Sequence, residues 1–99
     1  MKKIITSKNA PAPIGPYSQA VLSGNTLYVS GQIPLDPISG TMVNLDIASE
    51  THQVMKNLGE ILKAADMNYS NIVKATIFVT KLGNFVKINR IYGSYFKSD

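Results

Sequence analysis

A proline-rich stretch near the N-terminus constrains this chain more than any other part of its sequence. Residues 10–19 read Ala-Pro-Ala-Pro-Ile-Gly-Pro-Tyr-Ser-Gln, and the three prolines fix φ and restrict the residues that precede them. Two runs of strand-forming residues follow, 18–23 and 26–30, and Gly24-Asn25 separates them as a hairpin signal. The sequence therefore predicts a rigid loop that delivers Tyr17 to the start of an antiparallel pair of strands.

The clearest helical pattern covers residues 49–65, with Asp46 or Ser49 as candidate N-cap. Its apolar stripe is made of Val54, Met55, Leu58, Ile61, Leu62 and Ala65. The opposite side carries Glu50, Gln53, Lys56, Asn57, Glu60 and Lys63, which we expect to face solvent. A short strand over residues 4–6 and a loop over residues 34–40 complete the N-terminal half.

The C-terminal half predicts one further strand and one further helix. In residues 72–80, Val73, Ala75, Ile77 and Val79 alternate with Lys74, Thr76 and Phe78. The helix begins after Asn84, with Phe85, Ile88, Ile91, Tyr92, Tyr95 and Phe96 on its buried side. The order β-β-β-α-β-α predicts an α+β fold with both helices on the aliphatic face of one sheet. Because Tyr28 and Phe78 lie on the other face, we expect a partner subunit to cover it.

Composition limits the classes of function that fit this chain. Its 99 residues, 44% of them hydrophobic, suit one domain. Cysteine is absent, which excludes disulfides and thiolate catalysis and fits an intracellular, cytoplasmic protein. There is no apolar run of signal-peptide or membrane-spanning length, and no metal-ligand spacing or phosphate-binding loop. The net charge of +4 comes mostly from scattered lysines, which favours ordinary solvation over a nucleic-acid surface.

A candidate ligand pocket lies where the rigid loop meets the end of the second hairpin strand. Tyr17 could present its hydroxyl there, and Ser30-Gly31 could add a hydroxyl and an approachable backbone amide. Each has a structural alternative, since Tyr17 could simply pack beneath the loop and Ser30-Gly31 could form a strand-ending turn. His52, the only histidine, flanks the first helix without a serine–carboxylate arrangement, so we expect a surface or boundary role.

Several motifs in the same order resemble the RidA (YjgF) family of reactive-intermediate imine deaminases. The matching stretches are residues 10–19, 29–34, 72–79 and 85–92, followed by Tyr95-Phe96. The resemblance implies a chorismate-mutase-like fold that assembles as a homotrimer, with ligand pockets at the seams between subunits. It also implies hydrolysis of enamines and imines, such as 2-iminobutanoate and 2-iminopropanoate, to 2-oxo acids and ammonia without a metal or organic cofactor.

The resemblance assigns substrate-binding roles to four residues and leaves two family positions without a counterpart. Tyr17, Ser30, Gly31 and Asn89 correspond to the family's pocket residues. The family's carboxylate-binding arginine and water-orienting glutamate lie on C-terminal strands that would follow Asp99, so no catalytic residue is identified within the chain. We therefore expect a single domain, residues 1–99, that is shortened at its C-terminus and lacks those strands.

Three functions remain open from the sequence. The first is an imine and enamine deaminase, and the second is a non-catalytic regulatory trimer that binds small carboxylates. The third is an endoribonuclease or translation inhibitor, which the resemblance allows but no RNA-recognition motif in the chain supports. Small imines and 2-oxo acids are thus the expected ligands, with no membrane partner.

Overall fold

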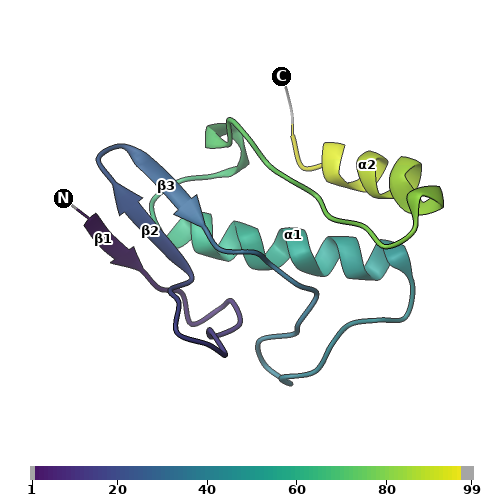
Figure 1. Ribbon diagram of the computed structural model, residues 1–99, viewed down its shortest axis with the longest axis horizontal. Coiled ribbons are helices and arrows are strands. Elements are labelled where there is room, and N and C mark those ends of the chain that lie inside the picture. Colours follow the sequence, from purple (N-terminus) through teal and green to yellow (C-terminus); the bar gives the residue numbers. More distant parts are fainter. Residues whose placement is uncertain (1, 97–99) are drawn as a thin grey trace.

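The computed structural model describes residues 2–96, in which three short strands form one antiparallel sheet beside two α-helices (Figure 1). The strands are β1 (Lys2–Ile5), β2 (Ala20–Ser23) and β3 (Thr26–Val29), paired in the order β1-β2-β3. The helices are α1 (Ile47–Ala64) and α2 (Phe85–Gly93), and the 3-10 turns are η1 (Tyr69–Asn71) and η2 (Leu82–Asn84). The α+β class is confirmed.

The predicted hairpin is present, and its turn depends on a glycine. Ser23 pairs with Thr26, so Gly24 and Asn25 alone connect β2 to β3. Gly24 has a φ of 60°, a conformation that glycine adopts without a steric penalty, at the first central position of the turn. The hairpin therefore closes in the minimum number of residues and fixes the register of the two strands.

The core lies between the sheet and the C-terminal half of α1. Ile5, Ala10, Ala20 and Ile61 are buried together, and Leu27 and Val29 of β3 pack against them with Leu22 and Ala65. Thr26 and Tyr28 alternate with these residues and are exposed, as the period of the strand requires. Strand alternation thus selects the β3 side chains that join the core.

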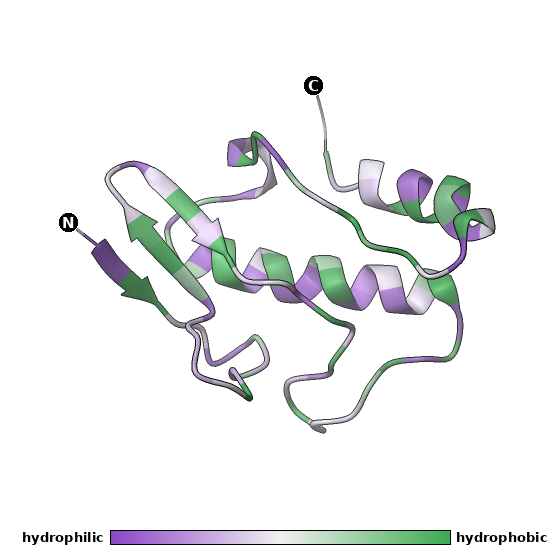
Figure 2. Ribbon diagram, in the orientation of Figure 1, coloured by the Kyte–Doolittle hydropathy of each residue, from purple (hydrophilic) through white to green (hydrophobic). Residues whose placement is uncertain are grey.

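Helix α1 starts two residues earlier than its apolar pattern indicates, because Asp46 is the N-cap and Ser49 is not. The Ser49 backbone N–H donates to Asp46 Oδ1 over 2.7 Å, which satisfies one of the free amides of the first turn. The apolar stripe is confirmed, since Met55, Ile61 and Leu62 are buried. Figure 2 shows the resulting alternation of hydrophobic and hydrophilic bands along the helix.

Asn57 is the exception on α1, and its predicted place on the solvent side is wrong. Its exposed fraction is 0%. Its Nδ2 donates to the carbonyls of Ile33 and Leu35 over 3.1 and 2.9 Å, and its Oδ1 accepts from Gln53 Nε2 over 2.9 Å. An amide can be buried at low cost when its hydrogen bonds are made, and hydrophobic periodicity cannot reveal that partners are present.

The predicted strand over residues 72–80 is absent. The stretch pairs with no strand in the described part of the chain, and Val73 and Phe78 are 98% and 92% exposed. Alternating β-branched residues favour a strand, but a strand forms only when its backbone pairs with a neighbouring strand. The sheet of residues 2–96 ends at β3, whose outer edge stays unpaired, and residues 72–80 form a connection without strand pairing.

Helix α2 packs against α1 and is held by aromatic contacts. Ile88 is its buried residue, as predicted, whereas Phe85 is 51% exposed and does not belong to the buried side. The rings of Tyr92 and Phe96 lie 4.8 Å apart, and Tyr95 lies 5.3 Å from the ring of Tyr69. Within residues 2–96, neither helix is both long and apolar enough to cross a membrane.

Replacing the N-cap tests the account of α1. The Ser49 amide holds the pKa of Asp46 below its usual value of 3.8, so the cap stabilises fully above that value and is lost as pH falls through the lower folded pKa. We expect Asp46→Ala to lower Tm by a few degrees at pH 7 and by less at pH 3. Asp46→Asn keeps an acceptor and is the control. Equal Tm values for the two variants at pH 7 would contradict the capping role.

The hairpin turn gives a second stability test. Gly24→Ala must place a side chain at a φ of 60°, and we expect a loss of about 1 kcal/mol in the free energy of unfolding. Gly83→Ala is the matched control, because a Cβ at Gly83 would meet nothing within 4 Å and its φ lies outside the left-handed region. Denaturant unfolding measures both. A Gly24 variant as stable as the Gly83 variant would show that the turn tolerates any residue.

Candidate functional site

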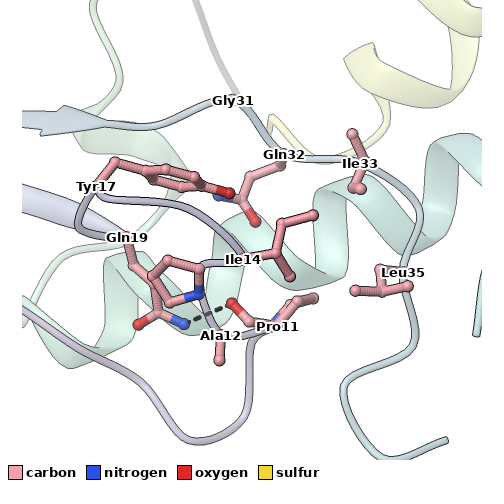
Figure 3. A pocket seen from close by; sticks show the side chains of 10 residues that line it. Pro11, Ala12, Ile14, Tyr17, Gln19, Gly31, Gln32, Ile33 and Leu35 are labelled. Carbon is pink, nitrogen blue, oxygen red and sulfur yellow. Dashed lines mark hydrogen bonds between the residues drawn. The ribbon is translucent and has the colours of Figure 1, made fainter. Parts of the chain in front are cut away.

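A small crevice lies between the proline-rich loop and the segment that follows β3 (Figure 3). Its volume is about 40 Å³, enough for one or two water molecules or one end of a small ligand. The lining residues are Pro11, Ala12, Pro13, Ile14, Tyr17, Gln19, Gly31, Gln32, Ile33 and Leu35. One wall therefore comes from residues 11–19 and the other from residues 31–35, which we call the loop wall and the strand-end wall.

Tyr17 and Gly31, two of the four predicted site residues, face this crevice from opposite walls. Tyr17 is 51% exposed, and its backbone N–H donates to the carbonyl of Gly15 over 2.8 Å. A Cβ on Gly15 would lie 3.3 Å from the Tyr17 ring. Glycine at this position therefore lets the backbone bend tightly and bring the ring close to it. A Cβ on Gly31 would touch nothing within 4 Å, which leaves its backbone open to an approaching ligand.

Ser30 ties the two walls together just outside the crevice. Its hydroxyl donates to the carbonyl of Ser18 over 2.6 Å, and its backbone N–H donates to the carbonyl of Gln19 over 3.0 Å. Its side-chain proton is therefore engaged within the fold. Ser30 positions its neighbour Gly31, and its oxygen can only accept a further hydrogen bond.

Asn89 is not brought to the crevice within this chain. It lies on α2, is exposed, and is absent from the residues that line the crevice. Its role in ligand binding stays a prediction from the family resemblance.

Two buried amides were missed as contributors to the site. Gln19 is 4% exposed, and its side chain bonds to the backbone of Ser7, Ala10 and Pro11. Asn57 bonds to the strand-end wall, as described above. For Gln19, the one sequence feature that could have indicated its role is its position directly after a loop whose prolines lack N–H donors. For Asn57, hydrophobic periodicity gives no indication of burial.

A second, more open groove of about 430 Å³ lies along α1 and is lined by Ser49, His52, Gln53, Lys56, Gly59, Glu60, Tyr69 and Tyr95. His52 is exposed, as predicted, and its Nδ1 lies 2.6 Å from the hydroxyl of Tyr95. Tyr69 donates to the carbonyl of Met55 over 2.6 Å. The pKa of Tyr69 is raised mainly by burial, and to a smaller extent by the neighbouring Tyr95 and Glu60. Burial also raises the pKa of Tyr95. Both phenols are therefore neutral at pH 7.

The chemistry of the crevice is that of an uncharged polar binding site. Among residues 2–96, Tyr17 is the one titratable residue that lines it, and the other polar contributors are Gln19, Gln32 and backbone groups. No group of three or more His, Asp or Glu side chains in residues 2–96 could hold a metal ion. The arrangement can orient a small polar molecule through a phenol and backbone amides, while proline and aliphatic side chains exclude water.

Comparison with known proteins identifies the same fold and motifs. The human 2-iminobutanoate/2-iminopropanoate deaminase is 48% identical over 99 residues, which cover 100% of this chain and 72% of the human protein. YyfA of the conserved Rid family from Yersinia pestis matches with a TM-score of 0.96 and 47% identity, over 99% of this chain and 78% of YyfA. Escherichia coli TdcF, solved with bound serine, matches with a TM-score of 0.90 and 37% identity, over 95% of this chain and 73% of TdcF.

The sequence profile of the endoribonuclease L-PSP family also matches, over residues 7–99. This range contains the loop wall, the strand-end wall and both helices. The chain therefore belongs to the endoribonuclease L-PSP family, the RidA/YjgF family that its sequence motifs resemble.

Proposed function

We propose that this protein is a 2-iminobutanoate/2-iminopropanoate deaminase that hydrolyses reactive imines and enamines. The observation that carries the proposal is the convergence of Tyr17 and Gly31 on one crevice. The 48% identity with the human deaminase extends over the whole chain and supports the same assignment. A relative solved with bound serine supports a ligand of this size and polarity.

The reaction asks little of the protein. Water adds to the electrophilic imine carbon, and the resulting carbinolamine expels ammonia as its C–O bond becomes the carbonyl of a 2-oxo acid. Catalysis consists of holding the substrate and directing the water, which the Tyr17 hydroxyl and the Gly31 backbone can support by hydrogen bonding. The resemblance assigns the carboxylate clamp and the water-orienting carboxylate to positions after Asp99, so the described crevice accounts for positioning alone.

We propose further that residues 1–99 act as one domain within a cytoplasmic homotrimer, with the crevice at the seam between subunits. Tyr17 is half exposed at the crevice mouth, and Asn89 lies outside it on α2, so a neighbouring copy could supply the missing side of the site. Tyr28, Val73 and Phe78 are 64%, 98% and 92% exposed, and a second copy would remove this apolar area from water.

A second candidate is a non-catalytic protein that binds small carboxylates. It is favoured by one observation, that the crevice in residues 2–96 contains no carboxylate side chain that could act as a general base. Binding can be achieved by a phenol and backbone amides, whereas a directed water usually needs a base. The ribonuclease activity after which the family is named has no support in the crevice, whose lining within residues 2–96 includes no histidine, lysine or arginine.

Turnover and binding separate the two candidates. We expect freshly generated 2-iminopropanoate to release ammonia and pyruvate faster with the protein than in buffer, and 2-oxobutanoate to bind in the same preparation. Binding without accelerated release would select the non-catalytic candidate. Failure of both would refute the assignment of the crevice.

The Tyr17 hydroxyl is tested by a conservative substitution. We expect Tyr17→Phe to lower ligand affinity, and kcat/KM where turnover is present, about three- to tenfold, the usual effect of losing one hydrogen bond. Tyr92→Phe removes a phenol on α2 that does not line the crevice and is the matched control. Equal losses in both variants would mean that the Tyr17 hydroxyl has no specific role.

Sedimentation tests the proposed assembly. A homotrimer should have three times the chain mass of 10.8 kDa, and we expect that species to dominate at micromolar concentration. Phe78→Ser should shift the equilibrium toward monomer, because Phe78 is 92% exposed and its removal leaves the core intact. A monomer at every concentration would refute the shared site.

A further inference from the structure

We propose that Gln19 and Asn57 are a pair of positioning residues, each of which holds one wall of the crevice in place. The inference rests on the proposed function and extends it, because it names what sets the distance between Tyr17 and Gly31. Both side chains are uncharged amides, both are buried, and each bonds to the backbone of one wall.

Gln19 holds the loop wall from inside the protein. Its Nε2 donates to the carbonyls of Ser7, Ala10 and Pro11 over 3.1, 3.3 and 2.8 Å, and its Oε1 accepts from the Ser7 backbone N–H over 2.6 Å. Figure 3 shows the bond to Pro11 beneath the crevice. Because Gln19 directly precedes β2, it joins the loop to the central strand of the sheet.

The loop needs this outside support because of its own composition. Its three prolines offer no N–H, so residues 11–16 cannot build a regular backbone ladder. A side-chain amide provides two donors and an acceptor at a single point, which replaces the missing backbone groups. Tyr17 follows this loop by one residue, so the position of its ring depends on the loop being held.

Asn57 holds the strand-end wall from the middle of α1. Its Nδ2 donates to the carbonyls of Ile33 and Leu35, which flank Pro34, another residue without an N–H. The two acceptors belong to residues that line the crevice. Gln53 in turn donates to Asn57 Oδ1 over 2.9 Å and fixes the orientation of the amide.

Together the two amides fix the distance between the loop wall and the strand-end wall. No buried side-chain nitrogen or oxygen among the described residues lacks a hydrogen-bond partner. Gln19 and Asn57 are 4% and 0% exposed, so neither amide can move without losing hydrogen bonds made within the fold. The walls have few direct links, of which the Ser30 bonds to residues 18 and 19 are the main ones. The width of the crevice, and hence the size of ligand it accepts, depends on Gln19 and Asn57.

Near-isosteric substitutions test each amide separately. We expect Gln19→Met to speed amide hydrogen exchange at least tenfold in residues 7–17 and to leave residues 31–35 unchanged. Asn57→Leu should do the reverse. Each should weaken 2-oxobutanoate binding about tenfold, with KM rising in the same proportion and kcat changing less than twofold where turnover is measurable. Asn44→Leu, which removes an exposed amide outside both walls, is the control.

The outcomes distinguish this proposal from failure of the proposed function. If the wild type binds 2-oxobutanoate and either variant binds equally well, or if exchange rises throughout the chain, the positioning role is refuted. If the wild type does not bind, the proposed function fails, and wall-specific exchange still decides the role of the amides. Gln19→Asn and Asn57→Ser, which shorten the reach of the donors, replace any variant that does not fold.

Discussion

The bonds of the Gln19 side chain to the backbone of residues 7–11 connect the functional loop to the rest of the protein. Three prolines fix φ angles in this loop but leave it with few N–H donors. The prolines therefore define the shape of the loop but do not attach it to the rest of the protein. The buried amide provides the attachment over distances of 2.6 to 3.3 Å. Without it, Tyr17 would remain on a stiff segment with no fixed place on the sheet.

The other parts of the structure serve this same junction. The Gly24 turn sets the register of β2 and β3, so that Ser30 meets Ser18 and Gln19 where the strands end. Helix α1 packs Ile61 beneath the sheet and Asn57 beneath the strand-end wall. Within residues 2–96 the crevice has one titratable side chain, and it suits the positioning of a ligand better than proton transfer.

Local signals in the sequence were sufficient for the hairpin, for both helices and for the meeting of Tyr17 with Gly31. They failed where the outcome depended on a distant partner. Residues 72–80 have the composition of a strand but pair with no other strand within residues 2–96. Asn57 is polar but buried, because its side chain finds backbone acceptors 22 and 24 residues away. Phe78 is exposed within residues 2–96, and under the proposed assembly a second copy would decide its environment and that of Asn89.

The most direct test of a ligand site between the two walls is amide chemical-shift mapping with 2-oxobutanoate. The account predicts the largest shifts at Tyr17 and Gly31, saturating together with one dissociation constant, and no shift at Lys56 in the groove along α1. Shifts confined to that groove, or none at Tyr17 and Gly31 under saturating ligand, would contradict it.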